Sequence, residues 1–117
     1  MTISVWHVRF AWAFTGTLCV ALVWAFLTPV AELPRFPTIS DYFWHIGLFA
    51  ILVIPLGTTL PAQRIWLVIF ALAFGTLLEI LQPYFGRGFE VHDLIANALG
   101  VALGWFVSTK LAWVLNR

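Results

Sequence analysis

The sequence predicts an all-α fold, a bundle of four membrane-spanning helices joined by short loops. Of its 117 residues, 62% are hydrophobic and only 9% are charged, whereas a soluble domain carries about 25% charged residues. The hydrophobic residues gather in four runs of about 20 residues, the length that an α-helix needs to cross a hydrocarbon core of about 30 Å. Proline, glycine and charged residues separate these runs. We therefore expect residues 1–117 to form a single integral membrane domain.

The first predicted helix covers residues 10–31, which contain no charged side chain. A cleaved signal peptide is the competing interpretation, but its apolar region is normally about 7–15 residues long and is followed by a small-x-small cleavage site. The run in this chain is longer, and no good site of that kind follows it. Pro34 and Pro37 then end the helix, because proline cannot continue a helical hydrogen-bond ladder.

Three further helices are predicted at residues 42–60, 65–82 and 93–114. The loops between them are short, and the last one contains Pro83 and Gly86, which interrupt helical structure. Four helices with loops this short pack as an up-down-up-down bundle. Both termini are then expected on the same side of the membrane.

Basic residues are distributed unequally between the two sides of this bundle. The side of the termini carries four of them: Arg9, Arg64, Lys110 and Arg117. The other side carries two, Arg35 and Arg87, and all five acidic residues fall in that half. Because cytoplasmic loops of membrane proteins are enriched in lysine and arginine, we expect the termini in the cytoplasm of a bacterial inner membrane. The acidic half would then face the periplasm or the cell exterior.

Polar side chains from three of the predicted helices and one loop meet at the outward end. Helix polarity brings the start of the second helix, the end of the third and the start of the fourth to the same depth. Spacings of three and four residues put the polar side chains of each helix on one face. The resulting candidate site, for a ligand or for a structural polar cluster, consists of Asp41, His45, Glu79, Gln82, Arg87, Asp93 and Asn97.

Simpler interpretations compete for several of these residues. Asp41 and Asp93 stand where N-cap residues belong, with side chains that accept hydrogen bonds from free backbone N–H groups. His45 has no cysteine or histidine partner at metal-ligand spacing, so a histidine satisfied within the bundle is favoured over a metal ligand. The sequence accordingly predicts no metal and no cofactor.

Glu79 is the residue that a purely structural role explains least well. It lies 14 residues after Ile65, about 21 Å along the helix axis at 1.5 Å per residue. A carboxylate at that depth costs about 2.5 kcal/mol or more unless it is paired or protonated. We expect Glu79 to point into the bundle with Arg87 or His45 within reach, either as a structural ion pair or as part of a ligand site.

The fourth helix also carries a row of small residues: Ala96, Gly100, Gly104 and Ser108. Their spacing of four residues puts them on one stripe of the helix. Rows of this kind let the backbone of a second membrane helix approach closely. We expect this stripe to be a helix-packing surface.

Four of these sequence patterns together resemble the signature of the VanZ-like family of membrane proteins. They are Asp41-x-x-x-His45, Glu79-x-x-Gln82, Arg87 and Asp93-x-x-x-Asn97-x-x-Gly100-x-x-x-Gly104. The resemblance extends over about residues 41–105, and it departs from the family at Tyr42, where a basic residue is usual. Glu90 and His92 have no place in the family pattern. The resemblance implies a small helical membrane protein, and the family's namesake is associated with resistance to the glycopeptide antibiotic teicoplanin.

Three functions are compatible with these features. The first, which we favour, is a non-enzymatic cell-envelope protein that binds a membrane lipid headgroup or a cell-wall precursor, with Arg87 meeting a phosphate group. The second is an accessory subunit docked on a larger respiratory or photosynthetic membrane complex. The third is an enzyme acting on a lipid-linked substrate, with His45 as the base and Glu79 or Asp41 orienting it, although no side chain offers an obvious nucleophile. A net charge of +1 without a basic cluster argues against a nucleic-acid partner.

Overall fold

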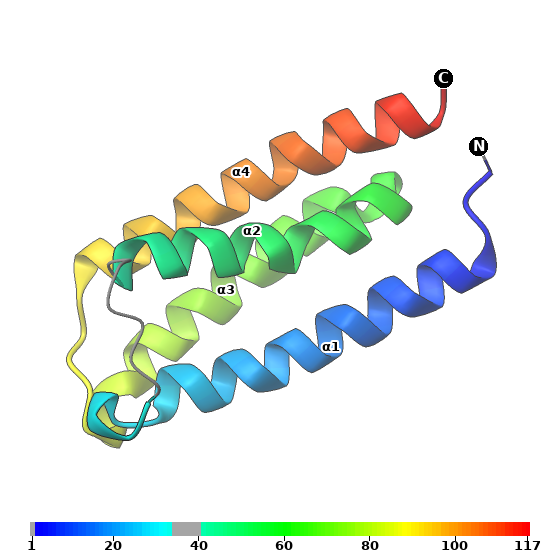
Figure 1. Cartoon of the computed structure of the whole chain (residues 1–117). Helices are drawn as coiled ribbons and strands as arrows, with labels where there is room; N and C mark the ends of the chain where they lie inside the picture. Colours follow the sequence, from blue (N-terminus) through cyan, green and yellow to red (C-terminus); the bar gives the residue numbers. More distant parts are fainter. Residues whose placement is uncertain (1, 34–40) are drawn as a thin grey trace.

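The computed structural model describes residues 2–33 and 41–117, and the regular elements in these ranges are all helical (Figure 1). The long helices are α1 (Val5–Leu27), α2 (Asp41–Thr59), α3 (Arg64–Leu81) and α4 (Val91–Leu115). Short 3-10 helices, η1 (Val30–Glu32), η2 (Pro61–Gln63) and η3 (Gln82–Phe85), lie in the connections. Each of the four long helices, in the part of the chain described, is long and apolar enough to cross a membrane. The predicted all-α bundle is confirmed, and the protein is a multi-pass membrane protein.

The first helix lies several residues earlier in the chain than the predicted range of 10–31. It begins earlier because Ser4 and His7 form a local cap, in which the Ser4 hydroxyl oxygen and the His7 Nδ1 atom are 2.7 Å apart. It ends earlier because Pro29 follows it. Thr28 is extended (φ −92°, ψ 135°), the conformation that a residue before proline prefers. The other helices begin and end within two residues of the predicted positions.

The helices run up and down, so both termini lie at one end of the bundle (Figure 1). We call this end, which also holds η2, the terminal end, and we call the opposite end, which holds η1 and η3, the polar end. A hydrophobic core lies between the helices: Leu22, Phe26, Phe49, Leu52, Val53, Ala71, Leu78 and Val101. Many large apolar side chains on the outer faces remain exposed, as expected for helices that contact lipid.

The most extensive helix contact joins α2 to α4, and the row of small residues lies in it. The members of the row are all buried: Ala96, Gly100, Gly104 and Ser108. A Cβ atom added at Gly100 would overlap the carbonyl oxygen of Ile46, and one added at Gly104 would lie 2.8 Å from that of Ala50. The two backbones therefore approach as closely as glycine allows. We call this contact the α2–α4 seam.

Candidate functional site

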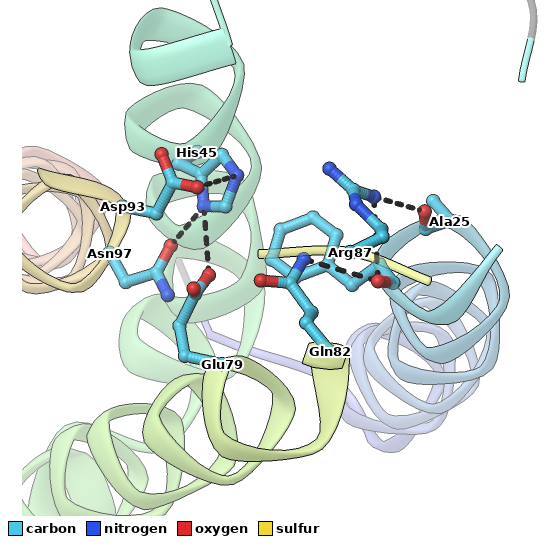
Figure 2. Close-up of polar contacts among 8 residues, drawn as sticks. Ala25, His45, Glu79, Gln82, Arg87, Asp93 and Asn97 are labelled. Carbon is cyan, nitrogen blue, oxygen red and sulfur yellow. Dashed lines mark hydrogen bonds and ion pairs between the residues drawn. The ribbon is translucent and has the colours of Figure 1, made fainter. Parts of the chain in front are cut away.

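Four polar side chains meet between α2, α3 and α4 near the polar end: His45, Glu79, Asp93 and Asn97 (Figure 2). We call them the His45 cluster. His45 Nδ1 lies 2.7 Å from Asn97 Oδ1 and 3.8 Å from Glu79 Oε1. His45 Nε2 lies 3.7 Å from Asp93 Oδ2. All four residues are about nine-tenths buried or more, so two carboxylates and an amide enclose the imidazole.

Each side chain of the cluster is placed by the end of a helix. His45 lies one turn into α2, and Glu79 lies in the last turn of α3. Asp93 and Asn97 lie four residues apart in α4, so they are on the same helix face one turn from each other. Glu79 therefore points into the bundle with His45 within reach, as the sequence led us to expect.

The N-cap interpretation of Asp93 is wrong. α4 begins two residues earlier than predicted, with Glu90 as its N-cap residue, so Asp93 is the third residue of the helix. Its carboxylate faces His45, although it remains in the first turn, where the helix dipole favours negative charge. Asp41 is the first residue of α2, and its side chain lies outside the described residues.

Glu79 makes no close hydrogen bond to a described residue, although the backbone N–H group of Glu90 lies near its carboxylate. Its exposed fraction is 0%, and neither carboxylate oxygen has a close hydrogen-bond partner among the described residues. The distance of 3.8 Å to the imidazole is too long for a hydrogen bond. The buried atoms Asn97 Nδ2 and Gln82 Oε1 also lack partners within the described ranges. Several buried groups at the polar end thus have unused hydrogen-bonding capacity.

Two further residues, not predicted from the sequence, shape the cluster. Phe26 of α1 lies against the imidazole, with ring centroids 4.5 Å apart. Gly75 lies one turn before Glu79 on α3, and a Cβ atom there would lie 3.1 Å from Asn97 Nδ2 and 2.8 Å from Phe49 Cε1. A glycine four residues before a buried carboxylate, on the same helix face, is the signal that could have revealed this position.

Arg87 and Gln82 bind the end of α1. Arg87 Nη1 donates to the carbonyl oxygen of Ala25 at 2.8 Å, and Gln82 Nε2 donates to that of Phe26 at 3.1 Å (Figure 2). The carbonyl of Ala25 needs this donor because its helical partner would be the N–H group of Pro29, which proline lacks. Within the described chain, Arg87 forms no ion pair, so of the two partners expected for Glu79, Arg87 or His45, it is His45 that lies within reach.

The turn between α3 and α4 allows Arg87 to reach back to α1. Pro83 lies at the start of η3, and Gly86 closes it with a left-handed backbone (φ 77°). Glycine adopts this conformation without the steric cost that a side chain would bring. The Arg87 N–H group then donates to the Gln82 carbonyl oxygen at 3.0 Å.

The His45 cluster favours ligands that bring positive charge or hydrogen-bond donors. It offers two carboxylates and an imidazole as acceptors, and one amide NH₂ group as a donor. One ligand atom from each of His45, Glu79 and Asp93 lies within 4.8 Å of the others, a spacing at which three residues could hold one metal ion. We expected these three residues at one site from the sequence but predicted no metal, because His45 has no cysteine or histidine partner at ligand spacing.

The chain matches the model of a known protein family. The family model VanZ/LLP1 matches residues 5–114, a range that holds the whole His45 cluster and nearly all of the four long helices. No curated protein and no solved structure matches the chain. Because the family match covers almost the whole sequence, the protein belongs to the VanZ/LLP1 family.

Proposed function

We propose that this protein binds the polar headgroup of a membrane lipid or of a lipid-linked cell-wall precursor at its polar end. One observation carries the proposal: buried polar atoms at this end have hydrogen-bonding capacity that no described residue uses. These atoms are Glu79 Oε1 and Oε2, Gln82 Oε1 and Asn97 Nδ2. A buried group without a partner costs about 1–3 kcal/mol. A ligand that supplies hydroxyl or amine groups would remove much of this cost.

Arg87 supports a ligand that carries a phosphate group. Among the described residues, only its Nη1 atom makes side-chain hydrogen bonds. Its Nε and Nη2 atoms are left to form the two parallel bonds that a phosphate accepts. Phosphate at Arg87, with hydroxyl or ammonium groups at the His45 cluster, would match the polar part of a lipid headgroup.

We further infer that the polar end faces outward from a bacterial cytoplasmic membrane. The basic residues described at the terminal end are Arg9, Arg64, Lys110 and Arg117, against Arg87 at the polar end. An excess of basic residues marks the cytoplasmic side of membrane proteins. Reporter fusions test this orientation. A fusion after Leu60 should read cytoplasmic and one after Arg87 external, and the reverse pattern would overturn it.

Lipid binding by paired asparagine variants tests the headgroup proposal. Asn97→Ala removes the amide of the cluster, whereas Asn116→Ala removes an amide at the other end of α4, where Nδ2 donates to the Ala112 carbonyl oxygen at 2.8 Å. Native mass spectrometry would measure how much phosphatidylglycerol, phosphatidylethanolamine or undecaprenyl phosphate the purified protein retains. We expect Asn97→Ala to weaken binding of at least one of these lipids about tenfold, which corresponds to about 1.4 kcal/mol for one lost hydrogen bond. Asn116→Ala should retain lipid as the unaltered protein does.

Equal retention of all three lipids by the two variants would overturn the headgroup proposal. If the protein were also recovered in a stable complex with other membrane subunits, that result would favour the accessory-subunit alternative. The two outcomes are separable, because the first is measured on the isolated chain and the second on the membrane extract.

A further inference from the structure

We infer that His45, Glu79 and Asp93 form a binding site for one divalent transition-metal ion, of the class to which Zn²⁺ and Co²⁺ belong. This inference goes beyond headgroup binding and does not depend on it. The three ligands come from α2, α3 and α4, so one ion would join three of the four helices. Asn97 would support the site without binding the ion.

The spacing of the donor atoms suits a metal ion. Zn²⁺ binds histidine nitrogen at about 2.0–2.1 Å and carboxylate oxygen at about 2.0–2.2 Å, so two ligand atoms of a tetrahedral ion lie about 3.3–3.5 Å apart. His45 Nε2 and Asp93 Oδ2 are 3.7 Å apart, and ligand atoms of all three residues lie within 4.8 Å of one another. Glu79 Oε1 lies 3.8 Å from Nδ1, so the Glu79 carboxylate would have to turn toward Nε2 to reach the same ion as Asp93. A fourth position would remain open to water or to a ligand group.

The imidazole of His45 is oriented for metal binding. Asn97 Oδ1 lies 2.7 Å from Nδ1, so the Nδ1–H group donates to the amide oxygen. In the neutral imidazole, the Nε2 atom then carries a lone pair, and it faces Asp93 Oδ2 at 3.7 Å. Two acceptors that face each other repel unless a proton or a metal cation lies between them. Metal-bound histidines almost always donate their second ring N–H group to an oxygen atom in this way.

Two ionised carboxylates in the cluster would need a positive partner. The described cationic residue nearest to Glu79 along the chain, Arg87, is bound to the carbonyl groups of Ala25 and Phe26. Glu79 is fully buried, and its two oxygens have no hydrogen-bond partner in the part of the chain described. Buried charges in proteins are paired or coordinate metals. One divalent ion would balance both carboxylates.

The type of donor atom selects the class of ion. Mg²⁺ and Ca²⁺ prefer ligands that are all oxygen. Imidazole nitrogen suits zinc and the neighbouring transition metals, and carboxylate oxygen completes many of their sites. The cluster should therefore bind Zn²⁺ more tightly than Mg²⁺.

Titration of the detergent-purified, chelator-treated protein with Zn²⁺ tests this site by isothermal calorimetry. We expect one Zn²⁺ ion per chain and no comparable heat from Mg²⁺. Zn²⁺ should also raise the melting temperature, because a ligand that binds the folded state stabilises it. Co²⁺ provides a second readout, since its visible absorption changes with the number and type of its ligands.

Side-chain variants separate this site from binding at the protein surface. Glu79→Gln and Asp93→Asn keep the side-chain size but remove the charge. Each should weaken Zn²⁺ binding by at least about 100-fold, the upper end of the loss seen for residues that only support a metal ligand. Asn97→Leu should weaken it by about 10–100-fold, because the imidazole loses its orienting partner. The control is His92→Gln, which alters an exposed side chain at the start of α4 and should bind Zn²⁺ normally.

Melting curves recorded without metal show whether each variant folds. Zn²⁺ should raise the melting temperature of the unaltered protein and of the control, but not that of Glu79→Gln. An unaltered protein without a saturable Zn²⁺ site would overturn the inference, as would equal affinity in Glu79→Gln and the control.

Discussion

At each end of the bundle, an arginine side chain binds a helix carbonyl group that lacks its usual N–H donor, but the surroundings of the two arginines differ. At the terminal end, Arg64 Nε and Nη2 donate to the carbonyl oxygen of Gly57 at 3.0 and 2.8 Å. At the polar end, Arg87 Nη1 donates to that of Ala25 at 2.8 Å. In both cases a proline lies four residues after the acceptor and lacks the N–H group that would otherwise bind it. Each arginine therefore replaces a donor that proline removes.

The surroundings of the two arginines differ. The polar end holds the His45 cluster, whose carboxylate at Glu79 lacks a described hydrogen-bond partner. At the terminal end, α1, α2 and α3 border an apolar groove of about 460 Å³. Residues that line this groove include Trp12, Gly16, Cys19, Leu56, Leu67 and Phe70. Because an arginine binds a helix carbonyl group at both ends, arginine alone does not distinguish the two ends, and the buried carboxylate of Glu79 does.

The largest effect should come from opening the α2–α4 seam, because this contact sets the position of the His45 cluster. Gly100→Ala adds a Cβ atom that overlaps the carbonyl oxygen of Ile46 and lies 2.9 Å from Phe49 Cβ. Overpacking of this kind lowers the free energy of unfolding by about 1–3 kcal/mol, and occasionally by more. Equilibrium unfolding in bicelles would measure the loss.

Gly47→Ala is the matched control for this change. A Cβ atom at Gly47, on α2, meets no atom within 4 Å. Alanine favours a helix over glycine by about 1 kcal/mol, so this variant should be as stable as the unaltered protein or more stable. Equal losses of unfolding free energy in Gly47→Ala and Gly100→Ala would show that the α2–α4 seam does not require the absence of a side chain at Gly100.

The fold was predictable because its main determinants act locally along the chain. Hydropathy locates the four helices, and proline and glycine locate the connections. The error at the end of α1 has a specific cause. The prediction ended that helix at Pro34 and Pro37, but Pro29 already lacks an N–H group and forces Thr28 into an extended conformation.

The membership of the His45 cluster was easier to predict than its contacts. Helix polarity and spacing set the depth and the face of His45, Glu79 and Asp93, and these can be read from the sequence. The partner of Arg87 depends on an unsatisfied carbonyl group 62 residues away, which no local pattern shows. The same three residues were expected at one site, but no metal was predicted, because the only metal-ligand spacing considered was that of cysteine and histidine.

An intermediate effect should come from removing each arginine that completes a helix. Arg64→Met and Arg87→Met each leave a helix carbonyl group without its donor. A hydrogen bond from a charged donor is worth about 1.5–3 kcal/mol, and both arginines are partly exposed. Each change should therefore lower the free energy of unfolding by about 1–2 kcal/mol. Arg9→Met is the control. Its guanidinium lies over the exposed ring of Trp6, 5.3 Å from the centroid, and its loss should cost about 0.5–1 kcal/mol at most.

Lipid retention by the same arginine variants tests whether the headgroup binds at the polar end and not at the terminal end. Arg87→Met should also reduce lipid retention in native mass spectrometry, whereas Arg64→Met should not. If both reduced retention equally, the headgroup would not be bound at the polar end alone. If Arg87→Met left the free energy of unfolding unchanged, the hydrogen bond from Arg87 to the Ala25 carbonyl oxygen would not stabilise the end of α1.

The smallest effect should come from two buried threonines that differ in their hydrogen bonds. Thr15 lines the groove, and its hydroxyl has no partner among the described residues. The Thr58 hydroxyl donates to the carbonyl oxygen of Ile54 at 2.7 Å. Valine has nearly the shape of threonine, so Thr58→Val should lower the free energy of unfolding by about 0.5–1.5 kcal/mol, whereas Thr15→Val should leave it unchanged or raise it slightly. Equilibrium unfolding of the two variants side by side would measure the difference. An equal loss at Thr15 would show that its hydroxyl has a partner in the membrane, and the groove would then be a polar contact site rather than an apolar one.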